Sequence, residues 1–197
     1  GPYAVLLHGS SSTFTDNVAF DGSNGIFLGN GGGDTLTFNG GFSSTAGSTS
    51  FNGTIITSGD AVSTGTSSIS GNSSITTSGG SISIGQLNGA FDLSLNSGAG
   101  TISLSQVGNN TPLINFSATT TAALALPNSI AATTTINLTS GGAITGAGTL
   151  TTDTLTVSSV GGFSKTGANQ VNNFNATNTT SGAISFVNTA APLIITG

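Results

Sequence analysis

Charged residues are scarce in this sequence, and their scarcity limits the partners open to the protein. They make up 4% of the 197 residues, against roughly a quarter in an ordinary globular domain. Lys165 is the only Lys or Arg, the six acids are all Asp, and the net charge is −5. A basic surface that could hold phosphate groups is therefore excluded, and nucleic acid is not an expected partner.

Cysteine, methionine and tryptophan are missing altogether. Without Cys there are no disulfides, which a fold with a continuous core does not need. No stretch approaches the length of about 18 consecutive apolar residues typical of a membrane-spanning helix. Residues 1–8 lack the basic segment of a signal peptide. We therefore expect no membrane span, and we expect the chain to be a piece of a longer exported protein or of a polymer.

Helical patterns are missing too, and the apolar residues follow a different periodicity. Hydrophobic residues reach 35% of the chain, which is too much for a disordered linker. They occur in short alternations such as Ile82-Ser83-Ile84, separated by runs of Gly, Ser, Asn and Thr. Alternations bounded by turn-forming residues predict short strands with one buried face.

These alternations repeat at intervals of about twenty residues. Ile82-Ser83-Ile84 recurs as Ile102-Ser103-Leu104, and Leu87 recurs as Val107 at the same offset. From Leu36 onward the chain can be arranged in three apolar columns. The first contains Leu36, Ile55, Ile75, Leu93, Ile114, Ile136, Leu155, Phe174 and Ile194; the second contains Phe42, Val62, Ile82, Ile102, Leu124, Ile144, Phe163 and Ile184; the third contains Phe51, Ile69, Leu87, Val107, Ile130, Leu150 and Val171.

A constant period of this length is typical of a solenoid, in which each repeat stacks on the previous one. Three columns indicate three short strands per coil. The predicted fold is all-β: a single right-handed parallel β-helix with about 20 residues per coil and roughly nine to ten coils spaced by about 4.8 Å. We treat residues 1–197 as one domain, with residues 1–13 as an irregular segment that does not fit the columns.

The two ends of the predicted stack are apolar, which suggests assembly. Natural solenoids cover their terminal coils, because an open strand edge above an apolar core invites pairing. We therefore expect end-to-end self-association, either as a homopolymer or as continuation of the same chain. The residues predicted to take part are Tyr3, Val5 and Leu7 at the start and Leu193, Ile194 and Ile195 at the end.

Several segments resemble the repeats of bacterial filamentous-haemagglutinin-type adhesins and autotransporter passengers. They include DTLTFNG (34–40), TSFNG (49–53), LSLNSGAGTISL (93–104) and residues 168–197, and the resemblance covers most of 34–197. The resemblance implies a secreted parallel β-helix on the bacterial cell surface or outside the cell. It also implies host or neighbouring-cell surface glycans or proteins as partners, without identifying a ligand.

Two Asp residues are the only candidates for a metal site. Residues 29–38 (GNGGGDTLTF) come close to a calcium-binding nonapeptide that contains Asp34, but tandem copies, which such sites need, are missing. Asp16 and Asp34 each precede a predicted strand at a similar place and could stack one coil apart, where two carboxylates would bind a cation or repel each other. A Gly-rich corner and a solvated surface pair are the alternative interpretations.

The sequence does not point to an enzyme or to a cofactor. Lys165 lies in a predicted turn (GFSKTG) without a nearby Asp, and His8 has no acidic partner in the repeats. The leading hypothesis is a non-enzymatic structural and adhesive module, a stalk or repeat segment of a surface adhesin. The first alternative is a protomer of an extracellular fibre built by head-to-tail stacking. A minor alternative is an ice-binding solenoid, although Thr runs such as 119–121 and 133–135 do not recur in each coil.

Overall fold

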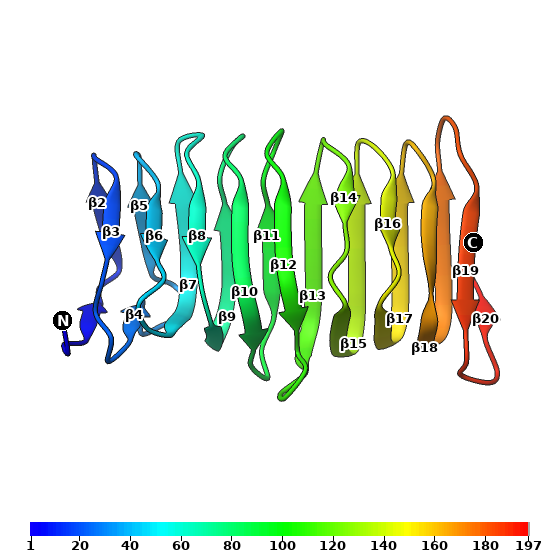
Figure 1. The fold of residues 1–197 in the computed structure, drawn as a ribbon, viewed down its shortest axis with the longest axis horizontal. Coiled ribbons are helices and arrows are strands. Elements are labelled where there is room, and N and C mark those ends of the chain that lie inside the picture. Colours follow the sequence, from blue (N-terminus) through cyan, green and yellow to red (C-terminus); the bar gives the residue numbers. More distant parts are fainter. Residues whose placement is uncertain (197) are drawn as a thin grey trace.

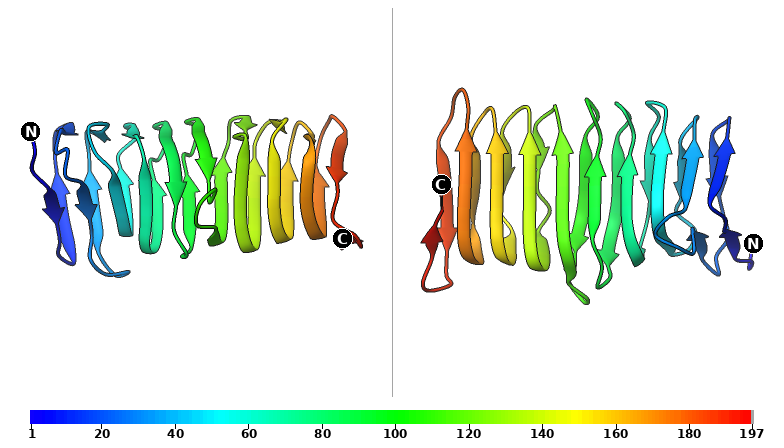
Figure 2. Two further views of the ribbon diagram at one scale, coloured as in Figure 1. Left: turned by 60° about the horizontal axis from the view of Figure 1, so that its bottom comes forward. Right: turned by 180° about the vertical axis from the view of Figure 1, so that it is seen from behind.

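The computed structural model describes residues 1–196; Gly197, the last residue of the predicted domain, lies outside them. Its strands pair in parallel and stack into a β-solenoid of about ten coils with about 20 residues each, as the sequence predicted. The coils follow one another along a rod, with the N- and C-termini near opposite ends (Figures 1 and 2). Helices are absent from the described residues, so none there could cross a membrane.

Three faces surround the core, and each face is a ladder of equivalent strands. Face 1 contains the strands β2 (Ser11–Phe14), β5 (Thr35–Phe38), β11 (Leu93–Asn96), β13 (Leu113–Thr120) and β20 (Ile194–Ile195). It also contains the C-terminal ends of five longer strands: β7 (Thr49–Thr57), β9 (Ser67–Thr76), β15 (Ser129–Ser140), β17 (Thr149–Ser159) and β18 (Phe163–Asn178).

The other two faces are shorter. Face 2 contains the strands β3 (Val18–Phe20), β6 (Phe42–Ser44), β8 (Val62–Thr64), β14 (Leu124–Ala125), β16 (Ile144–Gly146) and β19 (Ile184–Asn188). It also contains the starts of β10 (Ile82–Asn88), β12 (Ile102–Val107) and β18. Face 3 contains two whole strands, β1 (Val5–Leu7) and β4 (Ile26–Leu28). It also contains the starts of β7, β9, β15 and β17, the ends of β10 and β12, and the middle of β18.

The expectation that residues 1–13 are irregular is wrong. Strands β1 and β2 belong to the first coil and pair with β4 and β5. The strands of this segment do not match the column spacing because the first coil is longer than those that follow. Ser11 pairs with Thr35 and Thr35 pairs with Thr54, so the step from the first coil to the second is the larger of the two. A turn that holds extra residues moves a strand off a fixed period without breaking the ladder.

The second apolar column is confirmed almost throughout. Each of its steps is a pair in the strand register, apart from the step from Ile102 to Leu124. Ile82, for example, pairs with Val62 on one side and with Ile102 on the other. Like side chains therefore stack along this face, as the equal spacing predicted.

The first column is correct from Leu36 to Ile75 and again from Ile136 to Phe174, but it is wrong between these two stretches and at its end. Ile75 pairs with Leu95 instead of Leu93, because the coil contains a second apolar residue two positions away, with the same inward direction. The partner of Leu93 is Phe116, while Ile114 points outward and is 40% exposed. A register irregularity between Leu113 and Asn115 shifts the alternation there.

Three further register partners differ from the predicted ones, at the end of the first column and within the third. Phe174 pairs with Ile195 and not with Ile194. In the third column Leu87 pairs with Ser67, and Val171 pairs with Thr152. In the third column the small residues Ser67 and Thr152 occupy inward positions, so the apolar pattern alone predicts the wrong partner. At the end of the first column, Ile194 and Ile195 are both apolar, and the pattern selects the wrong one of the two.

The core is mostly aliphatic in the middle of the rod, where Phe116 is buried, and richer in aromatic residues toward both ends. Phe14 and Phe38 stack with ring centroids 4.8 Å apart in the first coils, and Phe174 and Phe186 stack at 4.5 Å in the last. Between them Ile, Leu and Val fill the interior, and nearly all are less than 4% exposed. Burial of this apolar surface is the main stabilising contribution to such a fold.

Buried hydroxyl groups close one corner of several coils. Thr57, Thr77 and Ser97 are fully buried and lie twenty residues apart. Each donates a hydrogen bond to the carbonyl oxygen three residues later, as from Ser97 to Gly100 at 2.7 Å. The coils approach closely here, because a Cβ atom on Gly100 would lie 2.2 Å from the carbonyl oxygen of Gly80. Glycine is therefore required at this corner.

Lys165 lies inside the core, and its expected place in a turn is wrong. It belongs to β18, is fully buried, and donates from Nζ to the carbonyl oxygen of Pro127 at 3.4 Å. Its register partner Gly146 leaves the space that the long side chain fills, since a Cβ atom there would be 3.1 Å from Nζ. Burial lowers the pKa of Lys165 to about 8.

Replacing Ile102 tests the inward and outward assignment of adjacent residues. Ile102 is 3% exposed and Ser103 is exposed. Ile102→Asp should lower the free energy of unfolding by several kcal/mol, because an unpaired carboxylate enters the core. Ser103→Asp should change it by less than about 0.5 kcal/mol. Urea unfolding followed by circular dichroism measures both, and equal losses would contradict the register.

The buried amine predicts a pH dependence of stability. The pKa of Lys165 is lower in the folded chain than in the unfolded chain, so the unfolded state binds more protons between about pH 8 and pH 10.5, and stability rises with pH across that range. Lys165→Met should remove this rise, roughly 2–3 kcal/mol, and should stabilise the protein at pH 7. Urea titrations of both proteins at pH 7 and pH 10.5 measure this change in stability. Tyr3 is present in both proteins, so its titration does not affect the difference between them. If the free energy of unfolding changed equally with pH in the unchanged protein and in Lys165→Met, the burial of Lys165 would be refuted.

Candidate functional site

A groove of about 370 Å³ runs along the side of the rod across several coils of face 1. Its inner row has one polar side chain per coil, on positions that are partners in the strand register. These are Thr54, Ser74, Ser94, Ser117 and Asn137. They point outward because they alternate with core residues, so the groove presents hydroxyl and amide groups at intervals of about 4.8 Å.

An outer row of the groove is formed by Asn72, Asp92 and Asn115, which hydrogen bonds connect along the axis. The backbone N–H of Asp92 donates to Oδ1 of Asn72 at 3.1 Å. Nδ2 of Asn115 donates to Oδ1 of Asp92 at 2.7 Å, and the hydroxyl of Thr135 donates to Oδ1 of Asn115 at 2.7 Å. The chain of bonds fixes these side chains in place on three successive coils.

The bonds leave some polar atoms of the outer row available. Within residues 1–196, Nδ2 of Asn72 and Oδ2 of Asp92 have no hydrogen-bond partner, so the groove offers both a donor and an acceptor there. Asp92 is the one charged residue that lines the groove. The site can therefore bind groups that donate and accept hydrogen bonds.

Two exposed apolar side chains lie next to the outer row. Phe91 is 38% exposed and Ile114 is 40% exposed. They precede Asp92 and Asn115, and the backbone N–H of Ile114 donates to the carbonyl oxygen of Phe91 at 3.0 Å. The two residues thus occupy equivalent positions on adjacent coils, and neither of them lines the groove.

Asp34 holds together a Gly-rich loop. Its Oδ2 accepts hydrogen bonds from the backbone N–H groups of Asn30 and Gly31, at 2.7 and 3.1 Å. The adjacent Gly29 has φ of +80° and approaches the next coil so closely that a Cβ atom would lie 1.8 Å from the carbonyl oxygen of Asn52. The loop is thus the Gly-rich corner considered as an alternative above.

The stacking of Asp16 on Asp34 is wrong. Thr35 pairs with Ser11, which places Asp34 beside Ser10. Asp16 lies beside Gly40, where a Cβ atom would be 2.6 Å from the Asp16 carbonyl carbon. The first coil is longer than the sequence interval between the two Asp residues, and this separates their carboxylates. Over residues 1–196, no cluster of three or more His, Cys, Asp or Glu side chains could hold a metal ion.

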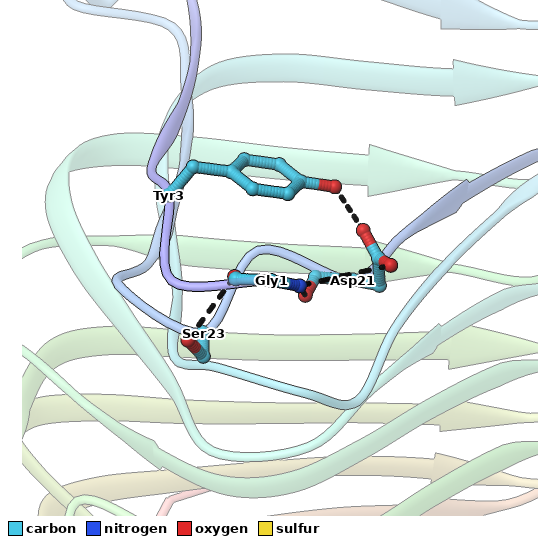
Figure 3. Close-up of polar contacts among 4 residues, drawn as sticks. All are labelled: Gly1, Tyr3, Asp21 and Ser23. Atoms are coloured by element: carbon cyan, nitrogen blue, oxygen red, sulfur yellow. Dashed lines mark hydrogen bonds and ion pairs between the residues drawn. The ribbon is translucent and has the colours of Figure 1, made fainter.

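The predicted assembly residues at the start of the chain differ in burial. Val5 and Leu7 are half-buried and pack on the core, whereas Tyr3 is exposed. Its hydroxyl donates to Oδ1 of Asp21 across the turn, as Figure 3 shows. This hydrogen bond raises the pKa of Tyr3 and lowers the pKa of Asp21. It joins the segment before β1 to the turn after β3.

The assembly residues at the other end are mostly exposed. Ile194 is 51% and Ile195 is 64% exposed, while Leu193 is half-buried against the core. Ile194 and Ile195 form β20, which pairs with β18. The two groups of residues lie near opposite ends of the rod (Figure 1).

Sequence reasoning missed the groove because it followed apolar residues only. Asn72 and Asp92 are twenty residues apart, so a search for polar columns would have found this pair. Asn115 follows Asp92 at a longer interval, and only the strand register shows that it continues the row.

We compared the chain with protein-family models, with curated proteins and with solved structures, and none of the three comparisons found a match.

Proposed function

We propose that the protein is a non-enzymatic structural and adhesive module, a stalk or repeat segment of a secreted bacterial surface protein. The observation that supports this most is the continuous parallel register of about ten coils, which makes a rod on the order of 45 Å long. Such a rod holds whatever it carries at a distance from its attachment point. The resemblance of residues 34–197 to adhesin repeats supports the same function.

The distribution of polar groups suits an adhesive rod. Outward positions of face 1 are uncharged in consecutive coils, for example Thr119, Thr139 and Ser158, which are register partners. Self-repulsion along the rod is therefore weak, and binding there would depend on hydrogen bonds and shape instead of long-range attraction. An adhesin with this surface would bind at short range and show little dependence on salt.

A surface location can be tested directly in the source bacterium. Antibodies raised against residues 1–197 should label intact cells, and proteinase K added outside the cells should remove the label, because a surface module is accessible to both. A cytoplasmic protein labelled in parallel should stay protected until lysis. Labelling that appears only after lysis would overturn the proposal.

The second candidate, a fibre protomer stacked head to tail, is favoured by the apolar surface of the last coil. Ile184, Val187, Ile194 and Ile195 are between 44% and 64% exposed there. A further coil, from the same polypeptide or from a second copy, would cover them and pair with the strand edges.

Stacking should make association depend on the last coil. Sedimentation velocity of residues 1–197 should show larger species as concentration rises, and the double change Ile194→Lys and Ile195→Lys should abolish them, because charges would be buried in the junction. Val160, 37% exposed at the side of the rod, gives the control Val160→Lys. Monomers at high micromolar concentration would exclude the fibre hypothesis.

A further inference from the structure

We propose that the groove on face 1 binds a neutral, extended oligosaccharide that lies parallel to the rod axis. This inference depends on the adhesive role proposed above and specifies its ligand class. The site combines the inner row (Thr54 to Asn137) and the outer row (Asn72, Asp92 and Asn115).

The dimensions of the groove fit a chain of sugars. Its inner row extends over five coils from Thr54 to Asn137, or roughly 19 Å at about 4.8 Å per coil. An extended chain of β-linked pyranoses advances by a similar length per sugar. Each of roughly four sugars would therefore face an equivalent set of protein groups.

The hydrogen-bonding groups match a ligand rich in hydroxyls. A sugar hydroxyl both donates and accepts, and Ser, Thr and Asn side chains do the same. Nδ2 of Asn72 and Oδ2 of Asp92 add an available donor and acceptor on adjacent coils. Asn115 is already held by bonds on both sides, so the outer row is preorganised and little ordering is needed on binding.

The charge of the groove favours a neutral ligand. No Lys or Arg lines it, and its single charged side chain is the carboxylate of Asp92. Sugars that carry carboxylate or sulfate groups would meet like charge without any compensating cation. Uronic-acid, sialylated and sulfated chains are therefore disfavoured.

An extended peptide fits the same groove less well. Peptides commonly bind to sheets by adding a strand at an open edge. Here β11 pairs with β9 on one side and β13 on the other, so the backbone groups along the groove are already used. A peptide would find only side chains as partners.

Titration calorimetry with residues 1–197 tests the proposal. The probes are hexamers of β-1,4-linked glucose and of β-1,4-linked N-acetylglucosamine, with a galacturonate hexamer and a Gly/Ser-rich peptide of similar length as comparisons. At least one neutral hexamer should bind, and the galacturonate hexamer and the peptide should bind at least 10-fold more weakly. Failure of both neutral hexamers to bind, or preferred binding of the acidic sugar or the peptide, would overturn the proposal.

Matched variants locate the site. Ser94 lies in the groove and Ser83 lies outward on face 2, and both are exposed. Ser94→Glu should weaken binding at least 10-fold, whereas Ser83→Glu should leave it unchanged. Circular dichroism melts confirm that the variants fold. Equal effects of the two Glu variants would place binding elsewhere and refute the groove. Surface labelling of cells together with a groove that binds no sugar would leave the rod as a stalk.

Discussion

Parallel pairing between successive coils is the constraint on which the rest of this structure depends. Each coil supplies hydrogen-bonding partners for the next, so Ile82 lies between Val62 and Ile102 and like residues stack in rows. The interior rows bury the apolar side chains, and the exterior rows create the polar surface. The groove follows from the same pairing, because one residue repeated at each coil becomes a continuous row along the rod.

The sequence predicted the architecture correctly because its period reports that pairing. Ile82-Ser83-Ile84 and Ile102-Ser103-Leu104 are register partners, as their equal spacing indicated. The local register is harder to predict from the sequence wherever a coil changes length. The turn before β13 holds extra residues, so a constant period predicts Ile114 in the core although it lies at the surface. The additional residues of the first coil likewise move β1 and β2 off the period, so the sequence pattern does not predict these two strands.

The candidate site was less predictable than the fold. Asp34 lies in a near-match to a calcium-binding motif, and Asp16 precedes a predicted strand at a similar place. The register separates the two residues, and Asp34 holds its own loop. The outer row of the groove depends on Asn72, Asp92 and Asn115 becoming neighbours, which requires the length of each intervening turn. The ice-binding hypothesis stays a prediction: outward positions of face 1 do recur on each coil, but they mix Thr, Ser and Asn.

The burial of Lys165 has a consequence for digestion. Trypsin-like proteases cleave after Lys or Arg, and this chain contains only the one such residue. Its side chain is enclosed in the core, and its backbone is paired in β18 with the coils on both sides. A protease of that specificity could cut the chain only after the stack around Lys165 had opened, so the intact rod offers such enzymes no accessible bond.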